Sequence, residues 1–313
     1  MAPARLVASI VALAAGIAAV AMSADLLHRT PGPVPTASSA PASAPAPAPA
    51  RRSPRFPAPP PGAVLFSRED GADALALAVV PQGGRMLVQA SVVGEQGAGV
   101  RGLSVDVGGT RALPCGAGCY RATVPRGRSI DLRVSGGKAA TRWTVALPSP
   151  WPPAGAAALV AHAGRVWRSL HSLAFTDRLA SDASHSVVST WRAVAPDRLA
   201  YRIRDGWSAV IIGGRRWDRA PRGRWIESPQ TATLRQPVPL WQAATDAHVI
   251  GSTRTAWRIS FFDPRTPAWF QITVDKRTMH TVELHMTTTA HFMHETYRAF
   301  DAAGSIAPPS TSR

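Results

Sequence analysis

The sequence predicts a mainly β protein: a small antiparallel β-sandwich, followed by an α+β domain in which one main helix packs on a curved antiparallel β half-barrel. Three observations predict this fold class. From residue 63 onward, short runs of alternating apolar and polar residues recur between Gly, Pro or Asp. Only the stretch 154–173 has helical periodicity. Of the ten tryptophans, all except Trp143 lie from Trp151 onward, so the second part must offer a broad apolar surface.

The N-terminal segment has the pattern of an export signal. Residues 6–24 carry no charge, one Arg precedes them, Asp25 follows them, and small residues stand at Ala19-Val20-Ala21. The apolar run is also about the 20 residues that a membrane-spanning helix needs. We therefore expect residues 1–24 to be a cleaved signal peptide or a single N-terminal membrane anchor. The rest of the chain is then either secreted or held outside the cytoplasm at the cell membrane.

Proline and alanine dominate residues 25–62, which predicts an extended linker of about 3 Å per residue that separates the folded part from a membrane. The net charge is +16, but lysine occurs only at Lys138 and Lys276, and arginine is scattered through every segment. Because export also removes DNA and RNA from reach, we expect no nucleic-acid partner. A general affinity for anionic surfaces is the more modest inference.

Residues 63–150 have the pattern of a small immunoglobulin-like sandwich. The alternating runs are 74–82, 86–94, 103–109, 119–125, 130–137 and 141–147. Cys115 and Cys119 are the only cysteines, and in an oxidising compartment they predict a disulfide across a short loop. A metal-binding pair is the alternative, although no His flanks it.

Residues 151–302 form the predicted half-barrel, after the break PSPWPP at 148–153. Leu159, Ala163, Val166, Trp167 and Leu170 recur at three- and four-residue steps and mark an amphipathic helix. The period then changes to two, which predicts a long antiparallel meander with strands in 172–181, 186–196, 198–206, 208–221, 223–229, 248–255, 256–264, 268–278 and 280–286. Residues 303–313 are expected to be a disordered tail.

A curved sheet around one helix would leave an apolar concave face, which can hold a lipid or another apolar ligand. Strand parity and size select the expected pocket residues. These are Trp191, Tyr201, Trp207, Ile211, Trp241, Phe261 and Trp269. For each of them, burial in an ordinary core is the alternative.

Three features of this second part resemble the LolA/LppX-like lipoprotein-carrier superfamily. The helix at 159–170 leads directly into SLAFTDRLA, GGRRWDRAPRGRWIESP at 213–229 is a strand-turn-strand segment, and AWFQITVDKRTMHTVELHM at 268–286 turns at an Asp. The resemblance covers about half the chain and implies an open β half-barrel with a helical lid that binds acyl chains. The sequence departs from many relatives in lacking the lipid-anchor Cys and in adding a linker and a sandwich.

The order of the sandwich, PCGAGCY, WPP, the helix, WDRAP, SFFDPRTPAWF and AHFMH is also similar to the extracytoplasmic C-terminal part of actinobacterial copper-transport proteins of the CopC/CopD type. Those proteins carry a multi-span membrane part in front, whereas only one apolar segment precedes here. The copper motif of CopC, an N-terminal His followed by Met-rich strands, is absent from 63–147. A copper role would therefore depend on the C-terminal part alone.

Residues 278–297, TMHTVELHMTTTAHFMHETY, hold four of the nine histidines and three of the six methionines. A two-residue turn at Thr288-Thr289 would set Met286 opposite His291, Leu284 opposite Met293 and Glu283 opposite His294. Met286, His291 and Met293 would then share a face, and two thioethers with an imidazole suit Cu(I). The competing interpretation, which the sequence favours, is a structural hairpin whose methionines fill the core.

No G-x-S-x-G elbow, HExxH motif or Gly-rich phosphate loop is present, so we expect no enzymatic activity and no cofactor other than copper. Three hypotheses follow. The first is an exported or anchored binding protein that holds an apolar ligand or docks on an envelope partner. The second is an extracytoplasmic copper-handling accessory protein, and the third is a structural envelope protein without a ligand.

Overall fold

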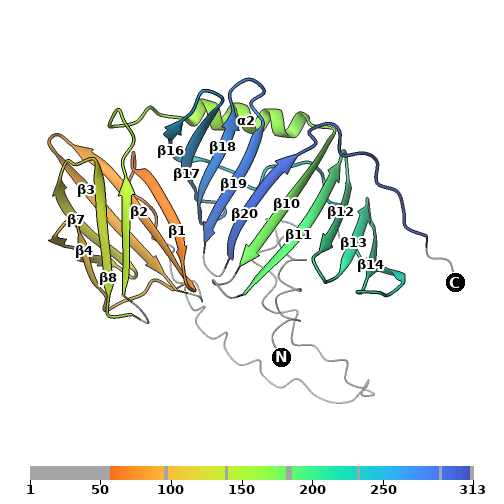
Figure 1. The fold of residues 1–313 in the computed structure, drawn as a ribbon, viewed down its shortest axis with the longest axis horizontal. Helices are drawn as coiled ribbons and strands as arrows, with labels where there is room; N and C mark the ends of the chain where they lie inside the picture. The colour runs from red at the N-terminus through yellow and green to blue at the C-terminus, as the bar shows by residue number, and fades with distance from the viewer. Residues whose placement is uncertain are drawn as a thin grey trace, which may run out of the picture. The chain divides into compact units, whose positions relative to one another are not determined.

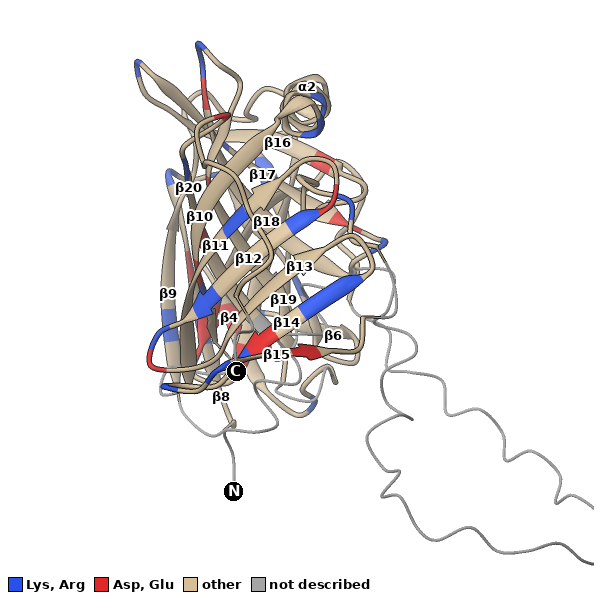
Figure 2. Cartoon of the chain, turned by 90° about the vertical axis from the view of Figure 1, so that its right-hand side faces the viewer, with Lys and Arg blue, Asp and Glu red and all other residues tan. Residues whose placement is uncertain are grey.

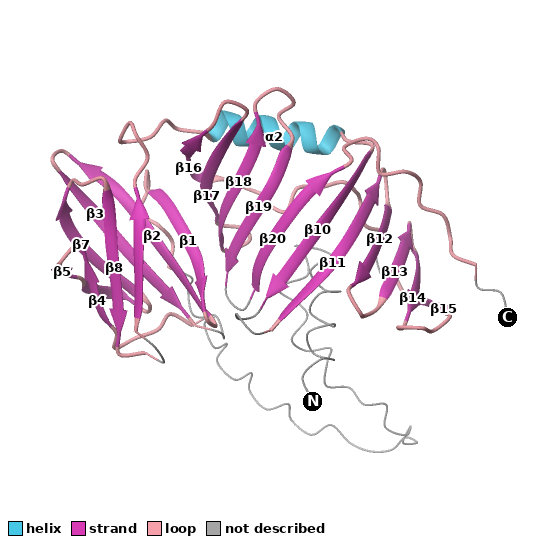
Figure 3. Ribbon diagram, in the orientation of Figure 1, coloured by secondary structure: helices cyan, strands magenta, loops and turns pink. Residues whose placement is uncertain are grey.

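The computed structural model describes residues 57–94, 98–137, 140–180, 185–230, 233–288 and 291–310. The chain from Phe56 onward forms one compact unit. In its described part the sheets are antiparallel, α2 is the one helix and no sheet closes into a barrel (Figure 3), so the predicted mainly β fold with one helix is confirmed. The predicted signal or anchor and most of the predicted linker lie outside the described residues. No described helix has both the length and the apolarity to cross a membrane.

Two sheets make the first folded part (Figure 1), with strand orders β1-β2-β3-β7-β6 and β5-β4-β8-β9. Alternate side chains from both sheets, among them Val64, Leu77, Val105 and Ile130, form a shared core, as the alternating pattern predicts. The structure joins Cys115 to Cys119 in a disulfide with Cα atoms 5.0 Å apart. The strands are β1 (Val64–Asp70), β2 (Asp73–Gln82), β3 (Arg85–Val93), β4 (Ser104–Val107), β5 (Thr110–Arg111), β6 (Leu113–Gly116), β7 (Cys119–Pro125), β8 (Ser129–Ser135) and β9 (Thr141–Ala146).

The second folded part is one open sheet with the order β15-β14-β13-β12-β11-β10-β20-β19-β18-β17-β16. Within β10–β15 and within β16–β20, strands that follow each other in sequence pair as neighbours, and β10 joins the two halves by pairing with β20. The bounds are β10 (Ser172–Ala180), β11 (Ser186–Val194), β12 (Arg198–Ile203), β13 (Ser208–Ile212), β14 (Arg215–Arg219), β15 (Trp225–Ser228), β16 (Thr245–Ser252), β17 (Ala256–Asp263), β18 (Ala268–Asp275), β19 (Thr281–Thr288) and β20 (His291–Arg298).

Helix α2 (Ala157–Ser169) crosses this sheet near one end of its strands, and Figure 2 views the helix along its axis beside the curled sheet. Its buried side includes Val160, Ala163 and Trp167. The Trp167 ring lies 4.5 Å from the Tyr297 ring and 5.8 Å from the Trp241 ring, centroid to centroid. We call the sheet face that bears Tyr297 the inner face and the opposite one the outer face.

Residues at both ends of the folded part make contacts with its body that the sequence does not predict. Residues 57–62, the end of the predicted linker, contact the body, since Gln89 donates to the Ala58 carbonyl at 3.0 Å and the Gly62 N–H donates to Asp246 at 2.6 Å. The predicted disordered tail is wrong for 303–310, because Ile306 is buried beside Val210 and Trp217. The tail has no periodic pattern that would reveal one buried side chain in advance.

Candidate functional site

Most of the predicted pocket residues do gather on the inner face. Strand pairing sets Tyr297, Phe175, Trp191 and Tyr201 side by side across four strands. Ile211 lies on the same face one strand farther on, and Trp241 packs against Phe261 at 5.9 Å between ring centroids. All five predicted residues in this group are buried by the protein itself. Their arrangement is therefore that of a core covered by α2 and by the segment around Trp241.

Two of the seven predicted pocket residues do not belong to this group. Trp269 points from the outer face and packs in a cluster with Leu65 and Phe292, because its neighbour Phe270 takes the inner position. Trp207 stands in the turn between β12 and β13 and is 39% exposed. Strand parity alone could not show which face of the sheet Trp269 lies on, since β18 has large apolar residues on both faces.

The predicted register of the last hairpin is wrong by one residue on each strand. Thr288 pairs with His291, whereas a turn at Thr288-Thr289 would have paired Met286 with His291. The methionines Met286 and Met293 face each other on the inner face, and both are buried at 5% and 6% exposure. The backbone of His291 continues this face, but its side chain is outside what the structure describes. The predicted set of Met286, His291 and Met293 is thus centred on two core methionines.

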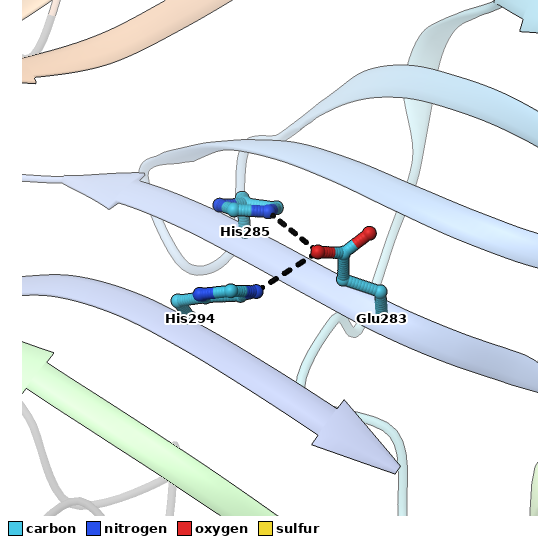
Figure 4. Close-up of side chains that lie close together, drawn as sticks. All are labelled: Glu283, His285 and His294. Atoms are coloured by element: carbon cyan, nitrogen blue, oxygen red, sulfur yellow. Dashed lines mark hydrogen bonds and ion pairs between the residues drawn. The ribbon is translucent and has the colours of Figure 1, made fainter. Parts of the chain in front are cut away.

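The same register creates a polar cluster on the outer face that the sequence did not single out (Figure 4). His285 and His294 are cross-strand partners, and their rings stack with centroids 4.1 Å apart. His285 Nε2 lies 3.2 Å and His294 Nε2 lies 2.9 Å from the same atom, Glu283 Oε1. The three side chains are 39–49% exposed. Within the described part of the chain, this is the one group of three such residues whose ligand atoms all lie within 4.8 Å of one another.

The second carboxylate oxygen of Glu283 is held from the neighbouring strand. Thr273 on β18 donates its hydroxyl to Glu283 Oε2 at 3.1 Å. This contact helps to hold the carboxylate in the orientation in which Oε1 is within hydrogen-bond distance of both Nε2 atoms. Such outer hydrogen bonds orient ligands in metal sites.

Local electrostatics favour the metal-binding form of Glu283 and His285. Burial raises the pKa of Glu283, but hydrogen bonds from His294, His285 and Thr273 outweigh that effect and hold the pKa below its ordinary value. Partial burial and the neighbouring His294 lower the pKa of His285. Near neutral pH, Glu283 is therefore ionised and His285 is neutral, which is the state that binds metal ions.

The spacing of the donor atoms fits one small ion. Bonds of about 2.0–2.2 Å from imidazole nitrogen and carboxylate oxygen place two ligand atoms on a common ion roughly 3 Å apart. The two nitrogen-to-oxygen distances already lie in that range, and the two imidazole nitrogens lie within 4.8 Å of each other. In the present arrangement both Nε2 atoms donate a hydrogen to the carboxylate, since an ionised carboxylate can only accept. An ion bound to both Nε2 atoms would take the place of those two hydrogens, and each neutral ring would then carry its single proton on Nδ1 instead of Nε2.

A signal for this cluster does exist in the sequence. Pairing Met286 with Met293 aligns two large apolar residues on one face, and it sets His285 opposite His294 on the other. This pairing was not predicted, because the expected turn at Thr288-Thr289 is incompatible with it. Comparison with known proteins does not assign the chain to a family, because no protein-family model and no curated protein matches its sequence.

Proposed function

We propose that this chain is an extracytoplasmic protein that binds a divalent transition-metal ion, Cu²⁺ above all, through Glu283, His285 and His294. One observation carries the proposal: two imidazole nitrogens from neighbouring strands converge on one carboxylate oxygen at 2.9 and 3.2 Å. The predicted export of the chain supplies the compartment, and the half-exposed position of the three side chains gives an ion direct access from solvent.

The donor atoms decide which ions fit. Two imidazoles and one carboxylate suit Zn²⁺, Ni²⁺ and Cu²⁺, and the general order of affinity among divalent ions favours Cu²⁺. Cu(I) prefers thioethers, but the nearest methionines, Met286 and Met293, point to the opposite face of the same two strands. The proposal therefore keeps the copper-handling hypothesis and changes both its ligands and the oxidation state of its ion.

Three protein ligands leave at least one coordination position to water or to another molecule. Structural metal sites normally fill all positions and lie in the interior. An exposed, incomplete site on a rigid sheet instead suits reversible loading and release. We therefore propose capture or transfer of the ion rather than a structural role.

The apolar-ligand hypothesis has a weaker basis. Its five residues on the inner face are already covered by α2 and by Trp241, so a lipid would first have to displace Trp241 or Trp167. Moving either ring away costs several kcal/mol of buried aromatic area, since burial is worth about 25 cal/mol per Å². We keep this hypothesis as a competing outcome of the experiment below.

The test is titration of the purified full chain with Cu²⁺ alone and with Zn²⁺ alone at pH 7.5, followed by calorimetry. We expect one site per chain, tighter for Cu²⁺, and an electron paramagnetic resonance spectrum with couplings from two nitrogens. Replacing either imidazole (His285→Gln or His294→Gln) should lower the affinity at least about tenfold and remove one nitrogen coupling. Glu283→Gln should weaken binding and leave both couplings.

His162→Gln, on the exposed side of α2, is the matched control and should bind as the wild type does. Absence of a site in the wild type, or equal affinity in all of these variants, would end the proposal. A lipid mass retained in native mass spectrometry, without metal, would favour the apolar-ligand hypothesis instead.

A further inference from the structure

The turns at one end of β12–β15 form an exposed basic surface. Arg204 and Trp207 lie in the turn between β12 and β13, and Arg222 and Arg224 lie in the turn between β14 and β15. Ser208, at the start of β13, pairs with Arg219, at the end of β14. The two turns therefore lie next to each other at the same end of these strands (Figure 1). We call this pair of turns, residues 204–207 and 219–226, the basic edge.

The charge of the basic edge is not neutralised by the protein. The basic edge holds four arginines, at 204, 219, 222 and 224, against the single acid Asp205. No side chain among Arg204, Arg222 and Arg224 makes an ion pair within the described part of the chain. Arg219 stands over the Trp225 ring at 4.6 Å, which holds its guanidinium at the surface. The nearby acids Asp218 and Glu227 are already paired, with Arg216 and Arg215 respectively.

Large apolar side chains are exposed at the same place. Trp207 is 39% exposed, and Ile226, next to Trp225, is 58% exposed. Among the described residues only Leu113 and Val238 share this property. An exposed apolar side chain alone needs no explanation, but an indole and an isoleucine beside unpaired guanidinium groups form an amphipathic combination. Guanidinium groups bind phosphate through parallel hydrogen bonds, and tryptophan favours the boundary between head groups and acyl chains.

We propose that the basic edge docks on an anionic phospholipid surface. The arginines contact the lipid phosphates, while Trp207 and Ile226 enter the interfacial layer. The contact does not depend on the metal site, which lies on β19 and β20. It would hold the sheet at a membrane in addition to any N-terminal anchor.

The experiment compares the full chain in vesicles of phosphatidylcholine containing 30% phosphatidylglycerol with the same chain in pure phosphatidylcholine. Hydrogen–deuterium exchange is followed in the peptides that cover 203–226, so insertion of the N-terminal segment does not affect the readout. We expect exchange in both turns to slow severalfold with the anionic vesicles only. The triple variant Arg204→Gln, Arg222→Gln, Arg224→Gln should lose this protection, since each arginine near an anionic surface contributes about a fivefold change in partition.

The matched control removes equal charge from exposed positions of the sandwich, with Arg111→Gln, Arg128→Gln and Arg133→Gln, and should keep the protection. The variant Trp207→Ser, Ile226→Ser should weaken it without loss of the folded circular-dichroism spectrum. Three results would overturn the proposal. These are equal protection on neutral vesicles, equal protection by a DNA duplex without lipid, and protection retained in the triple variant.

Discussion

Asp177 and Glu295 are two carboxyl groups paired across β10 and β20 in the interior of the protein. Tyr297 donates its hydroxyl to Glu295, and Asp177 Oδ1 has no hydrogen-bond partner in the described part of the chain. Burial raises the pKa of Asp177 to about 7, against a hydrogen bond from Ser189 that lowers it. Burial and then the nearby Asp177 raise the pKa of Glu295 well above its ordinary value. The pair therefore retains protons near neutral pH, where exposed carboxyl groups have lost theirs.

This pair predicts that stability falls as the pH rises. Between about pH 4 and pH 7 the folded protein keeps a proton on Asp177 that the unfolded chain has released, so the free energy of unfolding decreases across that window. Asp177→Asn keeps the shape and cannot ionise. We expect it to raise the free energy of unfolding by a few kcal/mol at pH 8 and to change it little at pH 4. Urea denaturation at both pH values measures the difference.

Asp131→Asn, at an exposed carboxylate on the sandwich, is the control and should give the same small effect at both pH values. If Asp177→Asn changes stability equally at pH 4 and pH 8, its charge is not the cause. The sequence could place Asp177 on the inner face, because Phe175 and Leu179 flank it at alternate positions. It could not reveal the facing Glu295, since no local pattern specifies a pairing between strands so far apart in sequence.

In the hairpin of β19 and β20, strand parity places the methionines on one face and the histidines of the proposed metal site on the other. Its inner face carries Met286 and Met293, and its outer face carries His285 and His294. A shift of one residue on each strand changes which side chains are opposite each other, although each residue keeps its face. For this reason the sequence found the methionine pair and the histidines but joined them in the wrong combination.

The double variant Met286→Leu, Met293→Leu discriminates between the two copper sites. We expect unchanged Cu²⁺ affinity, because both thioethers point away from Glu283, His285 and His294. We also expect a loss of stability below about 1.5 kcal/mol, since leucine conserves volume in the core. Calorimetric titration and urea denaturation measure the two quantities. A loss of copper binding in this variant, with His285→Gln unaffected, would restore the thioether site.

At the level of elements, the alternation of apolar and polar residues was sufficient to predict a strand wherever one face of the strand is buried and the other is polar. The predicted strands in 172–181, 186–196 and 198–206 correspond to β10, β11 and β12. The helix periodicity predicted α2 to within a few residues, because Ala163 and Trp167, two of the residues that define the period, lie on its buried side. Segments without a period were not predictable from the sequence, and these are the contacts of 57–62 and of Ile306.

An apolar cluster that is separate from the sandwich core joins the two folded parts. Strand β1 of the sandwich turns Val64 and Phe66 into the sandwich core, whereas Ala63 and Leu65 face a separate cluster with Trp269 and Phe292 of the second sheet. Polar contacts flank this cluster, including Arg178 to Glu69 at 3.3 Å and Gln271 to the Ser67 carbonyl at 3.1 Å. The break at 148–153 and the sandwich pattern of the sequence indicated separate domains. The consecutive apolar residues 63–66, which place apolar side chains on both faces of β1, were not among the predicted strands.

A shared core predicts that the sandwich and the second sheet unfold together. Differential scanning calorimetry of the wild type should therefore show one cooperative transition. Leu65→Asp places an unpaired charge among Ala63, Trp269 and Phe292, at a cost of the order of 4 kcal/mol. Because that cost falls on the junction and leaves each separate core intact, we expect two transitions in this variant.

Val64→Ala, on the same strand but facing the sandwich core, is the control, and it should lower the midpoint and keep a single transition. One transition in Leu65→Asp would mean that the remaining contacts across the junction, such as Arg178 with Glu69 and Gln271 with Ser67, are enough to couple the two parts.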